Sequence, residues 1–227
     1  MGGRGSFSAT HGGVAASSGG GMGYVPKTPE KREDIRELFI NQLGFTELYG
    51  TNKIGTAQMT ALAQELQKIE HEHHVLRDNK VALCATAKQG VYGYAAEMND
   101  GTYMIALNYK SHNNVGQKVK SQKEMAKSGF KTKTDGKITN DYSYTARHEY
   151  GHVKEFAITQ KTGKGANQIR KEVQDIAKKS YNTKSAPSKY GKENAFEFFA
   201  ESFASMTGGK PNGQGKALNK WLKNNNL

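Results

Sequence analysis

Two pairs of side chains that commonly bind metals stand four positions apart in this chain: His148 with His152, and Glu197 with Glu201. Residues four apart lie on one face of an α-helix, one turn from each other. Each pair can therefore point at one place only if its segment is helical. This requirement constrains the fold more than any other feature, because two helices must then face a common point.

Residues 148–152 read His-Glu-Tyr-Gly-His, an HExxH motif. The motif is informative only where its context is helical. Residues 142–156 contain no proline, and Asn140 and Asp141 just upstream are suitable N-caps. We therefore expect a helix that carries both histidines on one face.

Two imidazoles on one helix face suggest a zinc site. Zinc binds neutral imidazole readily, takes four ligands in a tetrahedron, and in catalytic sites keeps one position for water. A carboxylate on a later helix is the usual third protein ligand, and Glu197, Glu201 and Glu193 share one face of such a helix. Glu149, beside a ligand, can take a proton from the activated water and pass it to a leaving amine.

The segment Ser188–Phe203 reads Ser-Lys-Tyr-Gly-Lys-Glu-Asn-Ala-Phe-Glu-Phe-Phe-Ala-Glu-Ser-Phe. With the HExxH block it resembles the anthrax lethal factor-type zinc peptidases. In these gluzincins a tyrosine is followed by six residues and then by the zinc-binding glutamate of an E-F-F-A-E stretch. Tyr190 and Glu197 fit that spacing. The resemblance covers roughly residues 140–206, about a third of the chain.

The resemblance implies a role for each of six side chains. They are zinc ligation by His148, His152 and Glu197, general-base catalysis by Glu149, electrophilic assistance by Tyr190, and support of a ligand histidine by Glu201. The residues alone also allow the converse, with Glu201 as the ligand and Glu197 as its support. The spacing from Tyr190 favours Glu197, and Glu193 ranks last.

The remaining chain predicts a small sheet followed by helices. Asn99-Asp100-Gly101 is a hairpin turn signal. We expect helices over residues 28–43, 56–74, 115–128, 167–178, 192–206 and 216–223, and strands over 81–85, 91–95 and 103–108. The fold class is thus α+β, a zincin-like metallopeptidase fold with a small mixed sheet before the HExxH helix and a mainly helical C-terminal part. In that fold an edge strand beside the metal pairs with extended substrate, and Tyr103–Asn108 is the candidate.

Composition bounds the domain organisation. With 227 residues, we expect a flexible Gly/Ser-rich tail over residues 1–27 and one catalytic domain over residues 28–227. The single cysteine excludes an intramolecular disulfide and a cysteine-based zinc cluster. No secretory apolar region or membrane span is evident. We expect a cytoplasmic protein, or one delivered by a non-classical or phage-associated route.

The formal net charge of +12 raises the question of an anionic partner. The lysines are scattered, however. Lys120, Lys123 and Lys127 recur at helical spacing, with Lys118 just before them and Lys131, Lys133 and Lys137 after, and we expect a solvated helix face followed by a polar loop. No nucleic-acid-binding motif accompanies them.

The sequence therefore predicts a zinc-dependent metallopeptidase, an endopeptidase that acts on a protein or peptide substrate. A toxin, effector or phage-associated processing role would suit it. One alternative is a structural or interaction protein that binds zinc without turnover. The other is a basic nucleic-acid-binding module of a mobile element, marked by salt-dependent binding that is indifferent to chelator.

Overall fold

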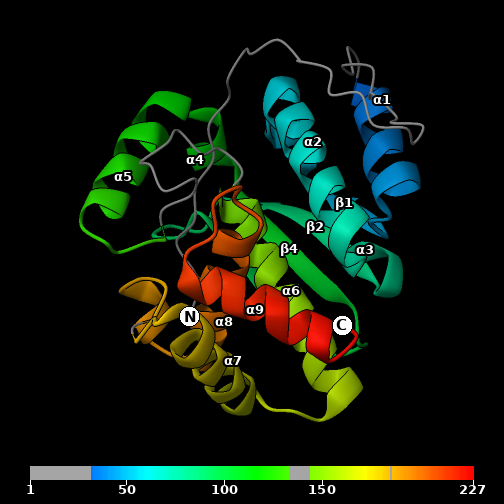
Figure 1. Ribbon diagram of the computed structural model, residues 1–227. Coiled ribbons are helices and arrows are strands. Elements are labelled where there is room, and N and C mark those ends of the chain that lie inside the picture. The colour runs from blue at the N-terminus through cyan, green and yellow to red at the C-terminus, as the bar shows by residue number, and fades with distance from the viewer. Residues whose placement is uncertain (1–31, 133–143, 185) are drawn as a thin grey trace, which may run out of the picture.

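The computed structural model describes residues 32–132, 144–184 and 186–227, which form an α+β fold (Figure 1). The elements in chain order are α1 (Arg32–Glu37), η1 (Leu38–Leu43), β1 (Glu47–Tyr49), η2 (Thr51–Lys53), α2 (Thr56–His73), α3 (Val75–Asp78), β2 (Val81–Thr86), β3 (Gly93–Glu97), β4 (Tyr103–Asn108), α4 (Tyr109–Asn113), α5 (Val115–Lys127), α6 (Tyr144–Thr162), α7 (Ala166–Tyr181), η3 (Tyr190–Lys192), α8 (Ala195–Met206) and α9 (Gly213–Asn224). The predicted tail, the helix start at residue 28 and the caps Asn140 and Asp141 lie outside the described residues.

The sheet has four strands in the order β1-β2-β4-β3. β1, β2 and β4 are parallel, whereas β3 runs antiparallel to β4 across the predicted turn at Asn99–Gly101. The prediction that Tyr103–Asn108 forms the edge strand is wrong. That segment is β4, which pairs with β2 on one side and with β3 on the other. Five of its six residues are buried. The strand at this edge of the sheet is β3, and β1 forms the other edge.

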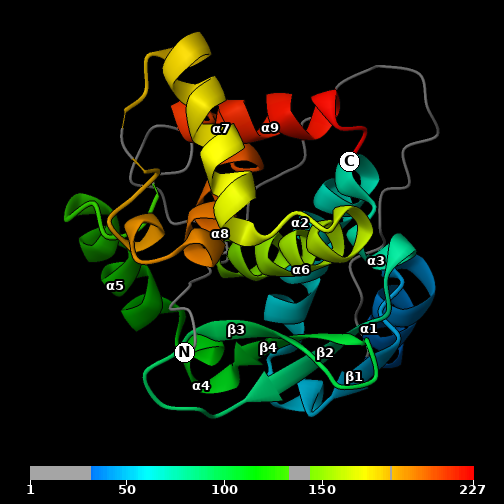
Figure 2. The same cartoon turned by 90° about the horizontal axis from the view of Figure 1, so that it is seen from below.

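The open edge of β3 faces away from the rest of the sheet. The backbone N–H of Asn108 donates to the Tyr92 carbonyl oxygen at 2.9 Å, so Tyr92 directs its backbone groups toward β4. Backbone groups alternate sides along an antiparallel strand, so Gly93 and Ala95 direct theirs to the open side. Helix α6 lies over this face of the sheet (Figure 2) and packs against β3.

The C-terminal helices form the second half of the core. α8 packs between α6 and α9, and α7 lies beside α9. Gly151 allows α6 and α8 to come close together, since a Cβ at this position would lie 2.9 Å from the Ala200 Cα and 3.0 Å from the Phe203 Cβ. Trp221 anchors α9 by donating from Nε1 to Glu172 of α7 at 2.7 Å.

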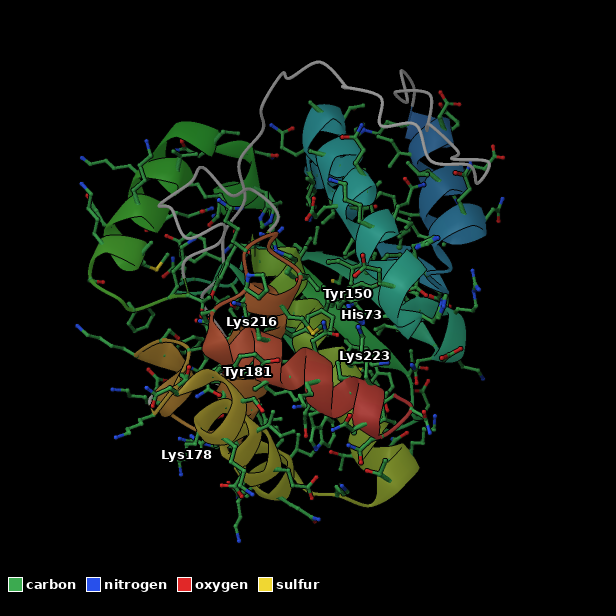
Figure 3. The ribbon with its side chains drawn as sticks, viewed as in Figure 1. His73, Tyr150, Lys178, Tyr181, Lys216 and Lys223 are labelled. Carbon is green, nitrogen blue, oxygen red and sulfur yellow. The ribbon has the colours of Figure 1, made fainter. Side chains whose placement is uncertain are left out.

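A buried carboxylate joins α2 and α3 to the motif helix. Glu70 accepts hydrogen bonds from the backbone N–H groups of Leu76 and Arg77, each at 2.9 Å, and from the Tyr150 hydroxyl at 2.7 Å. The chain turns sharply before α3 because His74 adopts a left-handed conformation with φ of 49°. Tyr150 and the neighbouring His73 lie where the end of α2 meets α6 and α8 (Figure 3).

Two helices begin at other residues than the apolar pattern predicts, because the position of the N-cap residue determines where each helix starts. α8 begins at Ala195 rather than at residue 192, since the Asn194 side chain accepts from the Glu197 N–H at 2.9 Å. α9 begins at Gly213 rather than at 216, since Asn212 caps it by accepting from the Gly215 N–H. The predicted helix end at Gly44 is confirmed, with φ of 93°.

The predicted solvated basic run is confirmed only in part, because Lys118 and Lys131 are buried. Lys133 and Lys137 lie outside the described residues. Lys120, Lys123 and Lys127 of α5 are all exposed. So are Lys178 of α7 and Lys216 of α9, which project from the outer surface (Figure 3). In the described part of the chain, no helix combines the length and apolar character needed to cross a membrane.

Candidate metal centre

Helix α6 brings three functional side chains of the HExxH motif into the interior. His148 and Glu149 are fully buried, and His152 is 7% exposed. The ring of His148 stacks between the rings of Tyr144 and Tyr190, with centroids 6.1 and 5.6 Å away. The two histidine rings meet edge to face at 4.9 Å. Their orientations are therefore held by packing on several sides.

Helix α8 carries the carboxylate that faces both histidines. Glu197 Oε2 lies 3.0 Å from His148 Nε2 and 3.6 Å from His152 Nε2. One ligand atom from each of these three buried residues falls within 4.8 Å of the others, a group that could hold a metal ion. Burial acts to raise the pKa of Glu197, but the adjacent histidines outweigh it and hold the pKa far below its usual range.

The donor atoms of this group fit a cation. His148 Nε2 and Glu197 Oε2 are buried, yet neither makes a hydrogen bond of normal geometry within the described residues, although they lie 3.0 Å apart. Buried polar atoms are rarely left in this state. Because the two atoms converge without pairing, they are oriented toward a shared point as ligands would be.

Glu201 contacts the opposite ring nitrogen of the same histidine. Its Oε1 lies 3.1 Å from His148 Nδ1, and its Oε2 accepts from the backbone N–H of Thr132 at 2.7 Å. Burial raises the pKa of Glu201 to about 7, against the opposing effects of Thr132 and Lys131. Glu193, the third carboxylate considered, is exposed. Neither Glu201 nor Glu193 belongs to the converging group.

Glu149 lies between the metal-binding group and the edge strand. Both of its oxygens are buried without a hydrogen bond of normal geometry in the described part of the chain. A Cβ on Gly93 of β3 would lie only 3.0 Å from Glu149 Oε1, so glycine leaves room for this carboxylate. Burial and the negative charge of Glu197 raise the pKa of Glu149 well above its usual range, and the Ala95 backbone N–H partly opposes them.

Tyr190 reaches the group from the short turn η3. Its hydroxyl donates to Glu197 Oε1 at 2.8 Å. Burial and the charge of Glu197 raise the pKa of Tyr190 well above its usual range, so the phenol stays protonated. Gly191 permits close packing here, since a Cβ would lie 2.9 Å from the Pro187 Cγ and 3.3 Å from the Glu201 Cβ.

The six predicted site residues thus come together from α6, η3 and α8. Sequence reasoning missed three other contributors: Gly93, Tyr144 and the Thr132 backbone N–H. Gly93 carried a weak signal, a glycine inside a strand pattern, which often marks a close approach. Thr132 carried none, because a backbone donor is independent of residue type.

A second histidine cluster does not form a site. His71 is exposed, and His73 instead packs its ring 5.2 Å from the Phe203 ring. Among the described residues, one group has ligand atoms close enough together to hold a metal ion, and it consists of His148, His152 and Glu197. Comparison of the chain with protein-family models, curated proteins and solved structures found no match. The functional argument therefore rests on the geometry of this group.

Proposed function

We propose that the protein is a zinc-dependent endopeptidase with a zincin-like fold that cleaves a protein or peptide substrate. One observation carries the proposal. Glu149, which is buried and makes no hydrogen bond of normal geometry within the described residues, lies beside the converging His148, His152 and Glu197 group and next to the open edge of β3. A buried carboxylate, a group that could hold a metal ion and an open strand edge are thus adjacent, which supports the proposal.

Zinc is the metal that suits these donors. Two imidazole nitrogens and one carboxylate oxygen are a frequent ligand set of catalytic zinc. When bound, the ion supplies a Lewis acid that makes water more acidic and polarises a carbonyl. On the protein side, Glu201 Oε1 lies 3.1 Å from His148 Nδ1, and with the proton on Nδ1 the Nε2 lone pair is directed at the group.

Glu149 is the proton carrier in this proposal. A carboxyl whose pKa lies above its usual range is a stronger base than an ordinary carboxylate, so it can take a proton from water and hold it. It accepts a proton from the attacking water as the C–O bond forms. It then delivers that proton to the amine nitrogen as the peptide C–N bond breaks. Neither oxygen makes a hydrogen bond of normal geometry within the described residues, so both are available for this transfer.

Tyr190 supplies a hydrogen-bond donor for the substrate. Its protonated phenol lies at the group through the bond to Glu197. A donor at this place can stabilise the negative charge that develops on the substrate carbonyl oxygen. Such a charge arises only in the transition state, so the contribution should appear in kcat.

The open edge of β3 provides the place for an extended substrate. Gly93 and Ala95 direct their backbone groups away from β4, and Gly93 lies beside Glu149. An extended peptide can pair with such an edge as an additional strand, and main-chain hydrogen bonds then hold it irrespective of sequence. This arrangement would place a peptide bond close to the converging group.

Two measurements on the full-length protein test the proposal. A diverse peptide library is incubated with and without chelator, and new termini are identified by mass spectrometry. We expect zinc-dependent cleavage that Glu149→Gln abolishes. Zinc binding without turnover at any pH would favour a structural protein, whereas chelator-indifferent, salt-dependent binding of nucleic acid would favour a nucleic-acid-binding module.

The metal content of two variants tests whether Glu197 is the carboxylate ligand. Glu197→Ala should lose zinc on dialysis, since even loss of an outer partner typically weakens metal binding ~10–100-fold. Glu193→Ala is the matched control, because Glu193 is exposed on the same segment and lies outside the group. Full zinc occupancy in Glu197→Ala would contradict the proposed ligand set.

A further inference from the structure

A cavity of about 490 Å³ opens where the chain enters the edge strand, between the start of β3, α4 and α5. We name it the α5 cavity. Its volume falls within the range typical of ligand sites. It is lined by Gly90, Val91, Tyr92, Asn108, Lys110, Ser111, Asn114, Gln117, Lys118, Ser121 and Met125.

The wall of the α5 cavity continues directly into the candidate active site. Tyr92 lines the cavity, and the next residue is Gly93, whose Cα lies beside Glu149. The wall is fixed by Asn108, whose Nδ2 donates to the carbonyl oxygens of Lys88 at 2.7 Å and Val91 at 2.9 Å. A peptide paired with β3 would therefore run past the mouth of this cavity.

The distance from the cavity to Glu149 sets which substrate residue can enter. An extended chain rises about 3.3 Å per residue. The cavity begins one residue before Gly93 and extends to Gly90, which is three residues before it. The occupying side chain should therefore stand about one to three residues from the scissile bond.

The lining of the α5 cavity favours an anion. Among the described residues it includes Lys110 and Lys118 and no aspartate or glutamate. Burial, then the charge of Lys131, lower the pKa of Lys118 well below its usual value, so Lys110 is the lysine that supplies positive charge. Lys110 is exposed at the rim, and lysine offers only donors. Hydroxyl and amide groups supply further donors, among them Tyr92 and Ser121, whose oxygens lie 2.6 Å apart. A carboxylate or phosphate would find both charge and hydrogen bonds here.

We propose that the α5 cavity is a specificity subsite for an anionic side chain of the substrate, a carboxylate or a phosphate, one to three residues from the scissile bond. The inference rests on the proposed peptidase function, because it places substrate along β3. It adds a substrate class, since the metal-binding group does not distinguish one peptide sequence from another.

The test uses C-terminally amidated peptides derived from one cleaved sequence. Glutamate, phosphoserine, glutamine or lysine is placed at each position within four residues of the cleaved bond. We expect kcat/KM to rise about tenfold for an anion over glutamine at one position only, the size of one charge-assisted hydrogen bond of roughly 1.4 kcal/mol. The two anions distinguish a carboxylate subsite from a phosphate subsite.

A charge swap identifies the residue responsible. Lys110→Glu should reverse the preference at that position from glutamate to lysine. Lys120→Glu is the matched control, because Lys120 is exposed on α5 and does not line the cavity. An equal preference at all positions, or an equal shift in both variants, would overturn the subsite and indicate attraction by net charge alone.

Binding separates this inference from the proposed function. Fluorescence anisotropy with the same peptides and the Glu149→Gln protein reports affinity without turnover. A position-specific preference for anions in binding, lost in Lys110→Glu, supports the subsite even if no peptide is cleaved. Cleavage that requires Glu149 but shows no such preference supports the peptidase and contradicts the subsite.

Discussion

The Tyr190 hydroxyl donates a 2.8 Å hydrogen bond to one oxygen of the Glu197 carboxylate, while the other oxygen faces His148 and His152. The phenol thereby fixes the rotation of the carboxylate that completes the metal-binding group. In the proposed mechanism this one hydroxyl proton would shift its hydrogen bond from Glu197 to the substrate oxyanion in the transition state. Tyr190 would then have two separable effects, one on metal binding and one on turnover.

Substitution of Tyr190 by phenylalanine should reveal both effects. Metal affinity should fall by no more than ~10–100-fold, the usual cost of losing a partner of a ligand. At saturating zinc, kcat and kcat/KM should still fall together, by ~10²–10³-fold for loss of an oxyanion donor. Zinc titration followed by steady-state kinetics measures the two separately. Near-wild-type kcat at saturating zinc would remove Tyr190 from the mechanism.

Glu149→Gln should lower the activity of the protein and raise its stability. The variant should lose most turnover, since a general base contributes on the order of 10²–10⁴-fold. Its metal-free form should nevertheless unfold at higher urea at pH 7, because an amide replaces a buried, unpaired carboxylate that costs more than about 1 kcal/mol. Because the pKa of Glu149 is higher in the folded chain than in the unfolded chain, wild-type stability should fall as pH rises above about 4.5. The variant should not show this fall. Equal urea midpoints would contradict this account of Glu149.

Gly151→Ala should push apart the two helices that carry the metal-binding group. The added Cβ would meet the backbone of Ala200 at 2.9 Å, a contact that side-chain motion cannot relieve. We expect a loss of about 1–3 kcal/mol in the free energy of unfolding, together with weaker zinc binding. Gly116→Ala is the control, since nothing lies within 4 Å of its Cβ position. That change should be neutral or stabilising by up to about 1 kcal/mol.

His73 should make the fold sensitive to mild acid. Burial, then the charges of Lys154 and His74, lower the pKa of His73 to about 4. The unfolded chain therefore binds a proton below pH 6.5 that the folded chain refuses until about pH 4. Stability should fall as pH decreases through this window, by about 2 kcal/mol between pH 7.5 and pH 5.

Urea unfolding of the metal-free protein at these two pH values measures the effect of His73. His73→Phe keeps an aromatic ring against Phe203 and should lose this part of the pH dependence. His71→Gln, at an exposed position of the same helix, should leave it unchanged. An identical pH dependence in His73→Phe and the wild type would contradict the assignment.

The sequence was most informative where local chemistry determines structure. The pairs His148 with His152 and Glu197 with Glu201 required helices, and Gly44 had to follow a helix because glycine readily adopts positive φ. The turn at Asn99–Gly101 correctly predicted that β3 and β4 are neighbours.

The sheet order was less accessible. β1 (Glu47–Tyr49) has three residues, too few for a periodic pattern, and was not predicted. The parallel pairing of β2 with β4 joins strands with another strand between them in sequence. No local signal reports such long-range pairing, so β4 was mistaken for the edge. The contact of Glu201 with the Thr132 N–H likewise links positions 69 residues apart.

The hydrogen bond from Tyr150 to Glu70 gives a structural role to one of the two variable positions of the HExxH motif. Tyr150 stands between the two histidines, and its partner Glu70 also caps α3. Unfolding of either α3 or α6 would leave the buried Glu70 carboxylate without some of its hydrogen bonds. The N-terminal helices and the motif helix should therefore unfold as one cooperative unit. Amides of α2 and α6 are then expected to share one rate of hydrogen exchange, and a fragment lacking α2 would not retain an ordered motif.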